Sequence, residues 1–344
     1  MDTSEKMLGF VRRALGLGES VPLQLLPLTA RGSDRTFYRL LWDHTKSAII
    51  VHYDPKRTEN SYYADIALFL RHIQVPVPEI MGHDPADCLI LMEDMGDQDL
   101  WSFRHAPWET RQAFYRKTLE AIHKLHSFPE KEFPSARVKL MEGFGPDLYL
   151  WERDYFREHF VKGVCGIKLE GTEGDQLEIE LSGLADRLGK SGRCLVHRDL
   201  QSQNVMIRDG EPFLIDFQGM RFGSPFYDLG SLLCDPYVDI SDSGRAELLS
   251  FYYSLSDSNL DWATFERAFW GASAQRLMQA LGAYGFLGLK KGLKAFLDFV
   301  PSGLRNLHHA TTEVSFLPRL QELCSECQKG IQTEDPSLKI LFNE

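Results

Sequence analysis

Three side chains that suit phosphoryl transfer stand close together in the middle of the chain. Residues 196–204 read VHRDLQSQN and residues 214–218 read LIDFQ, which places Asn204 five positions and Asp216 17 positions after Asp199. Phosphoryl transfer from a nucleotide needs a carboxylate that positions the attacking hydroxyl, and oxygen ligands for the magnesium ion that bridges the phosphates. Asp209-Gly210 predicts a hairpin between the two segments. That hairpin would fold the chain back, so that Asp216 could share a metal ion with Asn204.

Each of these residues taken alone is more typical of a surface loop, where Asp, Asn and His side chains cap helices and turns. Their joint order, with apolar strands on both sides of the hairpin, favours a catalytic site instead. We interpret His197 as structural, bracing the loop with hydrogen bonds.

Residues 216–237 read DFQGMRFGSPFYDLGSLLCDPY. Together with the preceding His-Arg-Asp…Asn loop, they resemble the protein-kinase-like superfamily and, within it, the aminoglycoside phosphotransferase family. The finer resemblance is to the anomeric kinases that phosphorylate N-acetylmuramate and N-acetylglucosamine in cell-wall recycling. It covers most of the chain, weakly before residue 90 and strongly from 194 to 240.

The resemblance implies an ATP-dependent enzyme that uses Mg²⁺. Asp199 would be the catalytic base or the group that orients the hydroxyl, and Asn204 and Asp216 would be the metal ligands. We also expect Tyr227 and Asp228 to pin the helix after the metal loop as structural support, because the acid can cap the amide groups of that helix.

Two segments are candidates for nucleotide binding. The turn at residues 31–39, RGSDRTFYR, resembles the phosphate-covering turn of the family, so Ser33, Asp34 and Arg35 are candidate phosphate contacts; a plain hairpin turn is the alternative. The link that contains Glu93 and Met95 resembles the inter-lobe segment whose backbone contacts adenine, and an ordinary loop is the alternative.

One position departs from the family pattern. Many kinases carry a phosphate-binding lysine on the strand at residues 49–53, IIVHY, where this chain has Val51 or His52. Lys56, Arg57 or Arg35 could supply the missing charge.

A polyhydroxylated acceptor calls for side chains that form several hydrogen bonds. Gln201, Gln218 and Arg221 stand beside the catalytic residues in the sequence and are candidate acceptor contacts. Glu152 and Tyr155 lie in a region that the family uses near its acceptor, with a solvated helical face as the alternative.

The positions of apolar residues predict two lobes. The first hundred residues read as short strands with one helix near 63–73, whereas helical periodicity prevails later, with helices over 245–256, 262–298 and 304–330. Strands are predicted over 205–208 and 213–217. We therefore expect an α+β, protein-kinase-like bilobal fold, with a small antiparallel-sheet nucleotide-binding lobe (1–95) and a larger, mostly helical catalytic and acceptor-binding lobe (96–344).

Composition excludes several classes of protein. The 344 residues include 38 Lys and Arg against 49 Asp and Glu, a net charge of −11 that argues against a nucleic-acid carrier. No run of 18 apolar residues predicts a membrane span, and the N-terminus lacks the pattern of a secretory signal. Six scattered cysteines fit reduced thiols, so we expect a cytoplasmic protein.

The sequence thus predicts an ATP-dependent kinase of a small molecule, with an amino sugar phosphorylated on its anomeric hydroxyl as the preferred acceptor. Two alternatives stay open. One is a kinase of another hydroxyl compound, such as an aminoglycoside, a choline-like alcohol or homoserine. The other, suggested by the missing lysine, is a nucleotide-binding module without catalysis.

Overall fold

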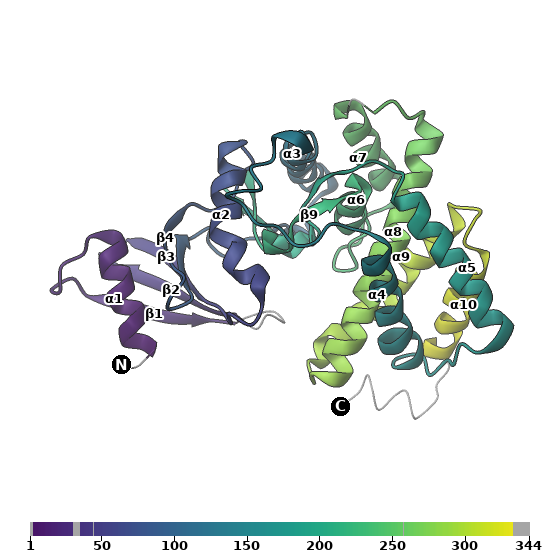
Figure 1. The fold of residues 1–344 in the computed structure, drawn as a ribbon, viewed down its shortest axis with the longest axis horizontal. Helices are drawn as coiled ribbons and strands as arrows, with labels where there is room; N and C mark the ends of the chain where they lie inside the picture. Colours follow the sequence, from purple (N-terminus) through teal and green to yellow (C-terminus); the bar gives the residue numbers. More distant parts are fainter. Residues whose placement is uncertain (1–2, 30–34, 44, 257, 333–344) are drawn as a thin grey trace.

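The computed structural model describes residues 3–29, 35–43, 45–256 and 258–332, which form two lobes (Figure 1). The smaller lobe holds a sheet of five strands, and the larger lobe is mostly helical. The predicted α+β class and bilobal architecture are therefore confirmed.

The sheet of the smaller lobe has the strand order β1-β2-β3-β5-β4, with every neighbouring pair antiparallel. This lobe consists of α1 (Thr3–Leu15), β1 (Leu23–Leu28), β2 (Thr36–Trp42), β3 (Lys46–His52), α2 (Thr58–His72), β4 (Ile80–Asp84) and β5 (Leu89–Glu93).

Strand β3 is buried on both faces, which explains its unbroken apolar run. Ile50 packs in a cluster with Phe10 of α1, whereas Ile49 and Val51 belong to the main core together with Leu70 of α2. Alternate side chains of a strand point to opposite faces, so the two helices cover the two sides of the sheet.

The sequence predicts one helix in the first hundred residues, and this prediction is wrong because α1 is a second one. Its apolar positions Met7, Phe10 and Val11 form a narrow stripe at helical spacing, and charged residues occupy much of the rest of the helix. So short a stripe gives a weak periodic signal.

The larger lobe is built around α8 (Trp262–Gly285), which is buried along most of its length. It packs against α4 (Pro146–Phe156), α6 (Pro225–Leu233) and α9 (Val300–Thr312) (Figure 1). The end of α8 can lie close to the π-helical segment η3 (Arg157–Lys162) because residue 285 is glycine. A Cβ atom at this position would lie 2.2 Å from the carbonyl oxygen of His159. None of the helices in the described ranges is both long and apolar enough to span a bilayer. The elements of this lobe are η1 (Leu100–Phe103), α3 (Trp108–His126), η2 (Glu130–Glu132), α4 (Pro146–Phe156), the π-helical η3 (Arg157–Lys162), α5 (Gly171–Leu188), β6 (Cys194–Val196), η4 (Ser202–Asn204), β7 (Val205–Arg208), β8 (Glu211–Leu214), η5 (Phe217–Gly219), β9 (Arg221–Gly223), α6 (Pro225–Leu233), α7 (Asp242–Leu255), α8 (Trp262–Gly285), the π-helical η6 (Phe286–Lys290), η7 (Lys294–Phe299), α9 (Val300–Thr312) and α10 (Pro318–Gln332).

Two of the predicted long helices are divided in the structure. The segment 262–298 contains α8, η6 and η7, with Gly292 in a left-handed conformation (φ 71°) between the last two. The segment 304–330 falls into α9 and α10, and Pro318 begins the second of them, because its fixed φ suits the first turn of a helix.

The hairpin predicted at Asp209-Gly210 is confirmed. Strands β7 and β8 pair from Val205↔Leu214 to Arg208↔Glu211, and both turn residues have positive φ (54° and 78°), as a tight two-residue turn requires. The second strand ends at Leu214, earlier than predicted, because Asp216 leaves the strand conformation with φ 66°.

The link between the lobes runs from the end of β5 at Glu93 to the start of η1 at Leu100. The predicted boundary between residues 95 and 96 falls within this link and stays a prediction.

Candidate active site

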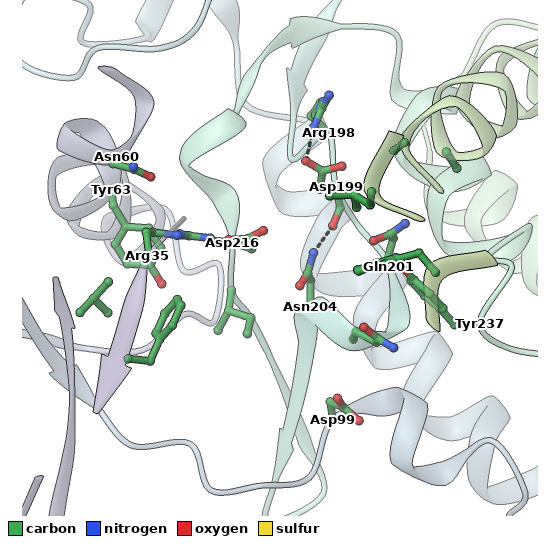
Figure 2. A pocket seen from close by; sticks show the side chains of 18 of the residues that line it. Arg35, Asn60, Tyr63, Asp99, Arg198, Asp199, Gln201, Asn204, Asp216 and Tyr237 are labelled. Carbon is green, nitrogen blue, oxygen red and sulfur yellow. Dashed lines mark hydrogen bonds and ion pairs between the residues drawn. The ribbon is translucent and has the colours of Figure 1, made fainter. Parts of the chain in front are cut away.

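A cavity of about 630 Å³ lies between the two lobes (Figure 2). Strands β1, β2, β3 and β5 and helix α2 line it from the smaller lobe. The loop after β6, the segment after β8, and α8 with η6 and η7 line it from the larger lobe. Asp199, Asn204 and Asp216 all belong to this lining, so the three candidate groups share one cavity.

The loop after β6, which we call the catalytic loop (residues 197–204), is held by two buried carboxylates. Asp228 accepts hydrogen bonds from the backbone N–H groups of His197 (2.6 Å) and Arg198 (2.8 Å). Asp235 accepts from the backbone N–H (2.7 Å) and the hydroxyl (2.5 Å) of Ser202. The prediction that Asp228 caps its own helix is wrong, because its carboxylate is turned toward the catalytic loop.

These hydrogen bonds offset a strained backbone. Arg198 has φ 79°, in the left-handed region that costs a residue with a Cβ about 1–3 kcal/mol. A hydrogen bond to a carboxylate contributes about 1.5–3 kcal/mol, and Asp228 accepts two. The Nε2 atom of His197 also lies 3.0 Å from the carbonyl oxygen of Ile215, which ties the catalytic loop to the segment before Asp216 and agrees with the bracing role predicted for this histidine.

The carboxylate of Asp199 lies between two guanidinium groups. Arg198 donates to Oδ2, and Nη2 of Arg276 from α8 lies 3.5 Å from Oδ1. Burial raises the pKa of Asp199, but Arg198 and Arg276 lower it further, so the pKa is below its usual range. Asp199 is therefore an anion that accepts hydrogen bonds.

Asn204 presents an oxygen atom to the cavity. Its Nδ2 donates to the backbone oxygen of Asp199 (2.9 Å), so this side of the amide must be the nitrogen, and Oδ1 is left for another partner (Figure 2). The positive φ of Asp216 directs the chain into η5 just where its carboxylate lines the cavity. One amide oxygen and one carboxylate fit Mg²⁺, which usually takes one or two carboxylates and completes its shell with phosphates and water.

An ion pair crosses the cavity between the lobes. Arg35, just before β2, donates to the carboxylate of Asp216 (Figure 2). Close by, the ring of Tyr63 in α2 stacks on that of Phe217, with centroids 4.4 Å apart. A positive charge from the smaller lobe thus lies at the acid that is the candidate metal ligand.

Residues 25–268 match the family model described as the phosphotransferase enzyme family (APH), which is more than half of the chain. The chain belongs to this family. The family resemblance drawn from the catalytic and metal loops is confirmed.

Proteins similar to this phosphotransferase carry names or titles with different small molecules. The N-acetylmuramate/N-acetylglucosamine kinase of Pseudomonas aeruginosa is 23% identical over 329 residues, 93% of either chain. Among solved structures, the ethanolamine kinase of Plasmodium vivax has a TM-score of 0.61 at 15% identity, covering 90% of this chain and 88% of the other. The ternary complex of streptomycin, ATP and the aminoglycoside phosphotransferase APH(2'')-IIa has a TM-score of 0.54 at 15% identity, covering 87% and 97%. At such identities the solved structures support the shared fold.

Two of the five predicted acceptor contacts, Gln201 and Tyr155, line the cavity of the phosphotransferase. The other three lie outside the lining. Gln218 donates to Asp216 (3.1 Å). Arg221 is largely buried and donates to the carbonyl oxygen of Gly219 (2.9 Å).

Glu152 is fully buried, in contrast to both the predicted acceptor contact and the solvated-face alternative. Helix α4 packs against α8, and this places Glu152 in the interior, where it accepts hydrogen bonds from Tyr227 (2.7 Å) and Gln275 (2.9 Å). Burial raises the pKa of its carboxyl group.

The candidate nucleotide contacts are divided in the same way. Arg35 lines the cavity, whereas Ser33 and Asp34 lie outside the described residues. Glu93 and Met95 lie outside the lining: Glu93 accepts from Arg208 (2.7 Å), and Met95 is buried. A contact between adenine and the backbone of this link stays a prediction.

Several lining residues were not predicted, and α8 contributes five of them. Arg276, Gln279 and Tyr284 face the cavity, as do Asn60 and Tyr63 of α2 and Tyr237 after α6. One signal could have indicated the first two: an arginine and two glutamines (Gln275, Gln279) interrupt an otherwise apolar run in α8. Buried polar groups of this kind need partners, and a site is one place where they find them.

Proposed function

We propose that this phosphotransferase is an ATP-dependent kinase that transfers the γ-phosphoryl group to a hydroxyl of a small acceptor, and that its acceptor is an amino sugar. The observation that carries the proposal is the presence of Asp199, Asn204 and Asp216 in the lining of one cavity between two lobes. A hydroxyl-orienting carboxylate and two oxygen ligands for a metal are what phosphoryl transfer requires of the protein.

Asp199 accepts a hydrogen bond from the attacking hydroxyl and directs its oxygen toward the phosphorus atom. Its lowered pKa suits orientation better than early removal of the proton, because a weakly basic carboxylate gains a proton only once the hydroxyl has become acidic. Such late transfer agrees with a loose transition state, in which little charge builds on the nucleophile.

Asp216 and Oδ1 of Asn204 would hold Mg²⁺, which when bound neutralises charge on the phosphates. The described residues contain no group of three or more His, Cys, Asp or Glu side chains suited to a metal ion. This agrees with an ion that arrives with the nucleotide and relies on its phosphates for most ligands.

Arg35 takes the place of the missing lysine at the nucleotide end. In the described part of the cavity lining there is no lysine, and Arg35 is within reach of the acid that would bind the metal. Next to it, Val51, Ile90 and Met92 of the sheet, with Ile215 opposite, form an apolar slot that suits a flat adenine ring.

The charged side chains around Asp199, where the phosphoryl acceptor would bind, favour a neutral or anionic acceptor molecule. Arg198 and Arg276 stand on the two sides of Asp199, so a polycationic aminoglycoside or a choline-like cation would meet two positive charges at the reacting group. An N-acetylated sugar meets no such repulsion. The N-acetylmuramate/N-acetylglucosamine kinase of Pseudomonas aeruginosa, similar over nearly its full length, supports this acceptor class. The choice of the anomeric hydroxyl rests on the resemblance of the metal loop to the anomeric kinases.

The test is an ADP-release assay with Mg²⁺-ATP over a panel of sugars, aminoglycosides, choline and homoserine, followed by phosphorus NMR of the product. We expect ADP release with N-acetylglucosamine or N-acetylmuramate and a phosphate on the anomeric oxygen. Release only with a cationic acceptor would overturn the amino-sugar assignment. ATP binding without any acceptor-dependent release would instead support the non-catalytic module.

A further inference from the structure

Two side chains of α8 form a hydrogen-bonded pair beside the catalytic carboxylate. Arg276 is 3% exposed and Gln279 is 7% exposed, and both line the cavity. Arg276 donates through Nε to the hydroxyl of Ser231 (3.1 Å) and through Nη1 to Oε1 of Gln279 (2.6 Å), while its Nη2 faces Asp199. One planar guanidinium group therefore holds the catalytic acid and the glutamine side by side.

This arrangement fixes which end of the Gln279 amide is available. A guanidinium group donates hydrogen bonds and accepts none, so the atom facing Arg276 must be the carbonyl oxygen. The Nε2 group, with two N–H donors, must then point elsewhere, and it makes no hydrogen bond to any described residue. Because Gln279 lines the cavity, its free donors are available to a ligand there.

The part of the cavity around Asp199, where the phosphoryl acceptor would bind, therefore offers a hydrogen-bond acceptor and a hydrogen-bond donor at neighbouring positions. Asp199 accepts a hydrogen bond, as a reacting hydroxyl needs, and Gln279 donates one, as a carbonyl oxygen needs. Ala280, which follows Gln279, and Ala283, one turn further along α8, present only methyl groups to the cavity, with Phe286 and Phe296 also in the lining. A small apolar group fits such a recess.

We propose that Gln279, oriented by Arg276, is a specificity-determining residue that donates to the carbonyl oxygen of an N-acyl group next to the reacting hydroxyl. The inference rests on the proposed sugar-kinase function and narrows it to sugars acylated on the nitrogen beside the phosphorylated carbon. The acyl methyl group occupies the recess at Ala280 and Ala283. A free amine at the same position is excluded, because an ammonium group would face the N–H donors of Gln279 and the charge of Arg276.

The test replaces the hydrogen-bond donor of Gln279 by a hydrogen-bond acceptor. In Gln279→Glu the new carboxylate pairs with Arg276, which keeps the side chain in place, and it offers only acceptor oxygens to the cavity. We expect the ratio of kcat/KM for N-acetylglucosamine to that for glucosamine to fall at least tenfold. Glucose, whose C2 hydroxyl both donates and accepts, should change least of the three. Gln176→Glu, the same substitution at an exposed position of α5, is the matched control and should leave the ratio unchanged.

Gln279→Met is a second variant, which removes the donors without adding charge, and calorimetric titration of the sugars measures binding apart from turnover. If Gln279→Glu melts well below the wild type, Gln279→Met decides: we expect N-acetylglucosamine to bind at least fivefold more weakly and glucose to bind unchanged. An acetylglucosamine-to-glucosamine ratio that stays constant in a folded variant would overturn the role of Gln279 while leaving the sugar-kinase function intact. A wild-type enzyme that phosphorylates no sugar would overturn the proposed function itself.

Discussion

The two sides of the active-site cavity are built in different ways. On the side of the larger lobe, buried hydrogen bonds fix the backbone of the catalytic loop, and two arginines flank Asp199. On the side of the smaller lobe, the described lining is mostly apolar, and Arg35 extends from it to Asp216.

This difference leads us to expect that the two lobes affect different kinetic parameters. A loop held by buried carboxylates is already arranged for reaction, and such preorganisation affects the rate of the chemical step. An apolar slot with two arginines, Arg35 and Arg57, in the same lining contributes to nucleotide affinity. Substitutions in the larger lobe should therefore lower kcat, and substitutions in the smaller lobe should raise the KM for ATP.

The largest effect is expected at Asp199, for which we propose the role of orienting the attacking hydroxyl. Asp199→Asn keeps the size of the side chain but replaces one acceptor oxygen by a donor nitrogen, so the attacking hydroxyl loses its orienting anion. We expect kcat to fall more than about a hundredfold, within the range of general acid–base contributions, in a variant that still folds. Its melting temperature should be lower, because Arg198 and Arg276 lose the charge of their partner. Asp175→Asn on the exposed face of α5 is the control. If the variant kept more than a few per cent of turnover, the role of Asp199 would be refuted.

Asp216→Ala tests the metal side of the same argument. It removes the only carboxylate among the two candidate magnesium ligands, and we expect a loss of activity as large as that of Asp199→Asn. A titration with Mg²⁺ should then fail to restore wild-type turnover. Full recovery at high Mg²⁺ would mean that Asp216 contributes only affinity for the ion and is not needed for the chemical step.

A smaller effect is expected at Asp228, whose carboxylate fixes the backbone of the catalytic loop. In Asp228→Asn, one of the two backbone donors loses its acceptor, and an unsatisfied buried donor costs about 1–3 kcal/mol of folding free energy. We expect a lower melting temperature together with a roughly tenfold lower kcat, as a slight misplacement of catalytic groups implies. The control is Asp261→Asn, where the acid also accepts a backbone N–H but at an exposed helix cap. An unchanged kcat at a reduced melting temperature would break the link between loop rigidity and rate.

Arg35→Ala examines the other side of the cavity. Removing this charge should raise the KM for ATP about ten- to a hundredfold, the value of one charge-assisted contact, while kcat changes less. Arg35→Lys should recover part of the affinity, and Arg13→Ala on the exposed surface of α1 should have no effect. Calorimetry with ATP gives the binding constant directly. A fall in kcat at constant KM would contradict the proposed division between the lobes.

The parts of the site that could be predicted from the sequence are those that are local in it. Asp199, Asn204 and Asp216 occur within 18 consecutive residues, and the Asp-Gly turn between them has a strong conformational preference. For the same reason the bilobal fold could be expected: strand and helix periodicities are local signals, and they change near residue 100.

The contributions that could not be predicted depend on packing between distant segments. Arg276 meets Asp199 across 77 positions, and nothing in the neighbourhood of either residue indicates that α8 lies beside the catalytic loop. Glu152 is the converse case. Its surroundings in the sequence, LYLWERDYF, mix apolar and charged residues, so the helix could turn either face inward until the position of α8 decides.

The smallest effect is expected for Glu152→Gln. This substitution tests whether Glu152 stabilises the packing of the larger lobe or contacts the phosphoryl acceptor. Burial raises the pKa of Glu152 in the folded protein, so its protonated form is favoured there, and stability falls as the pH rises through that pKa.

The amide introduced by the substitution would resemble the protonated acid at all pH values. Its new N–H group can donate to Gln275, whose Oε1 lacks a hydrogen bond in the described structure, once that amide turns over. We therefore expect the melting temperature of the variant to rise relative to that of the wild type as the pH increases above the ordinary pKa of a glutamic acid, because only the wild type then holds a carboxyl group that tends to ionise in the interior. The KM for the acceptor should stay the same, since Glu152 lies outside the cavity lining. An increase in that KM, with no pH-dependent difference in melting, would return Glu152 to the acceptor contacts.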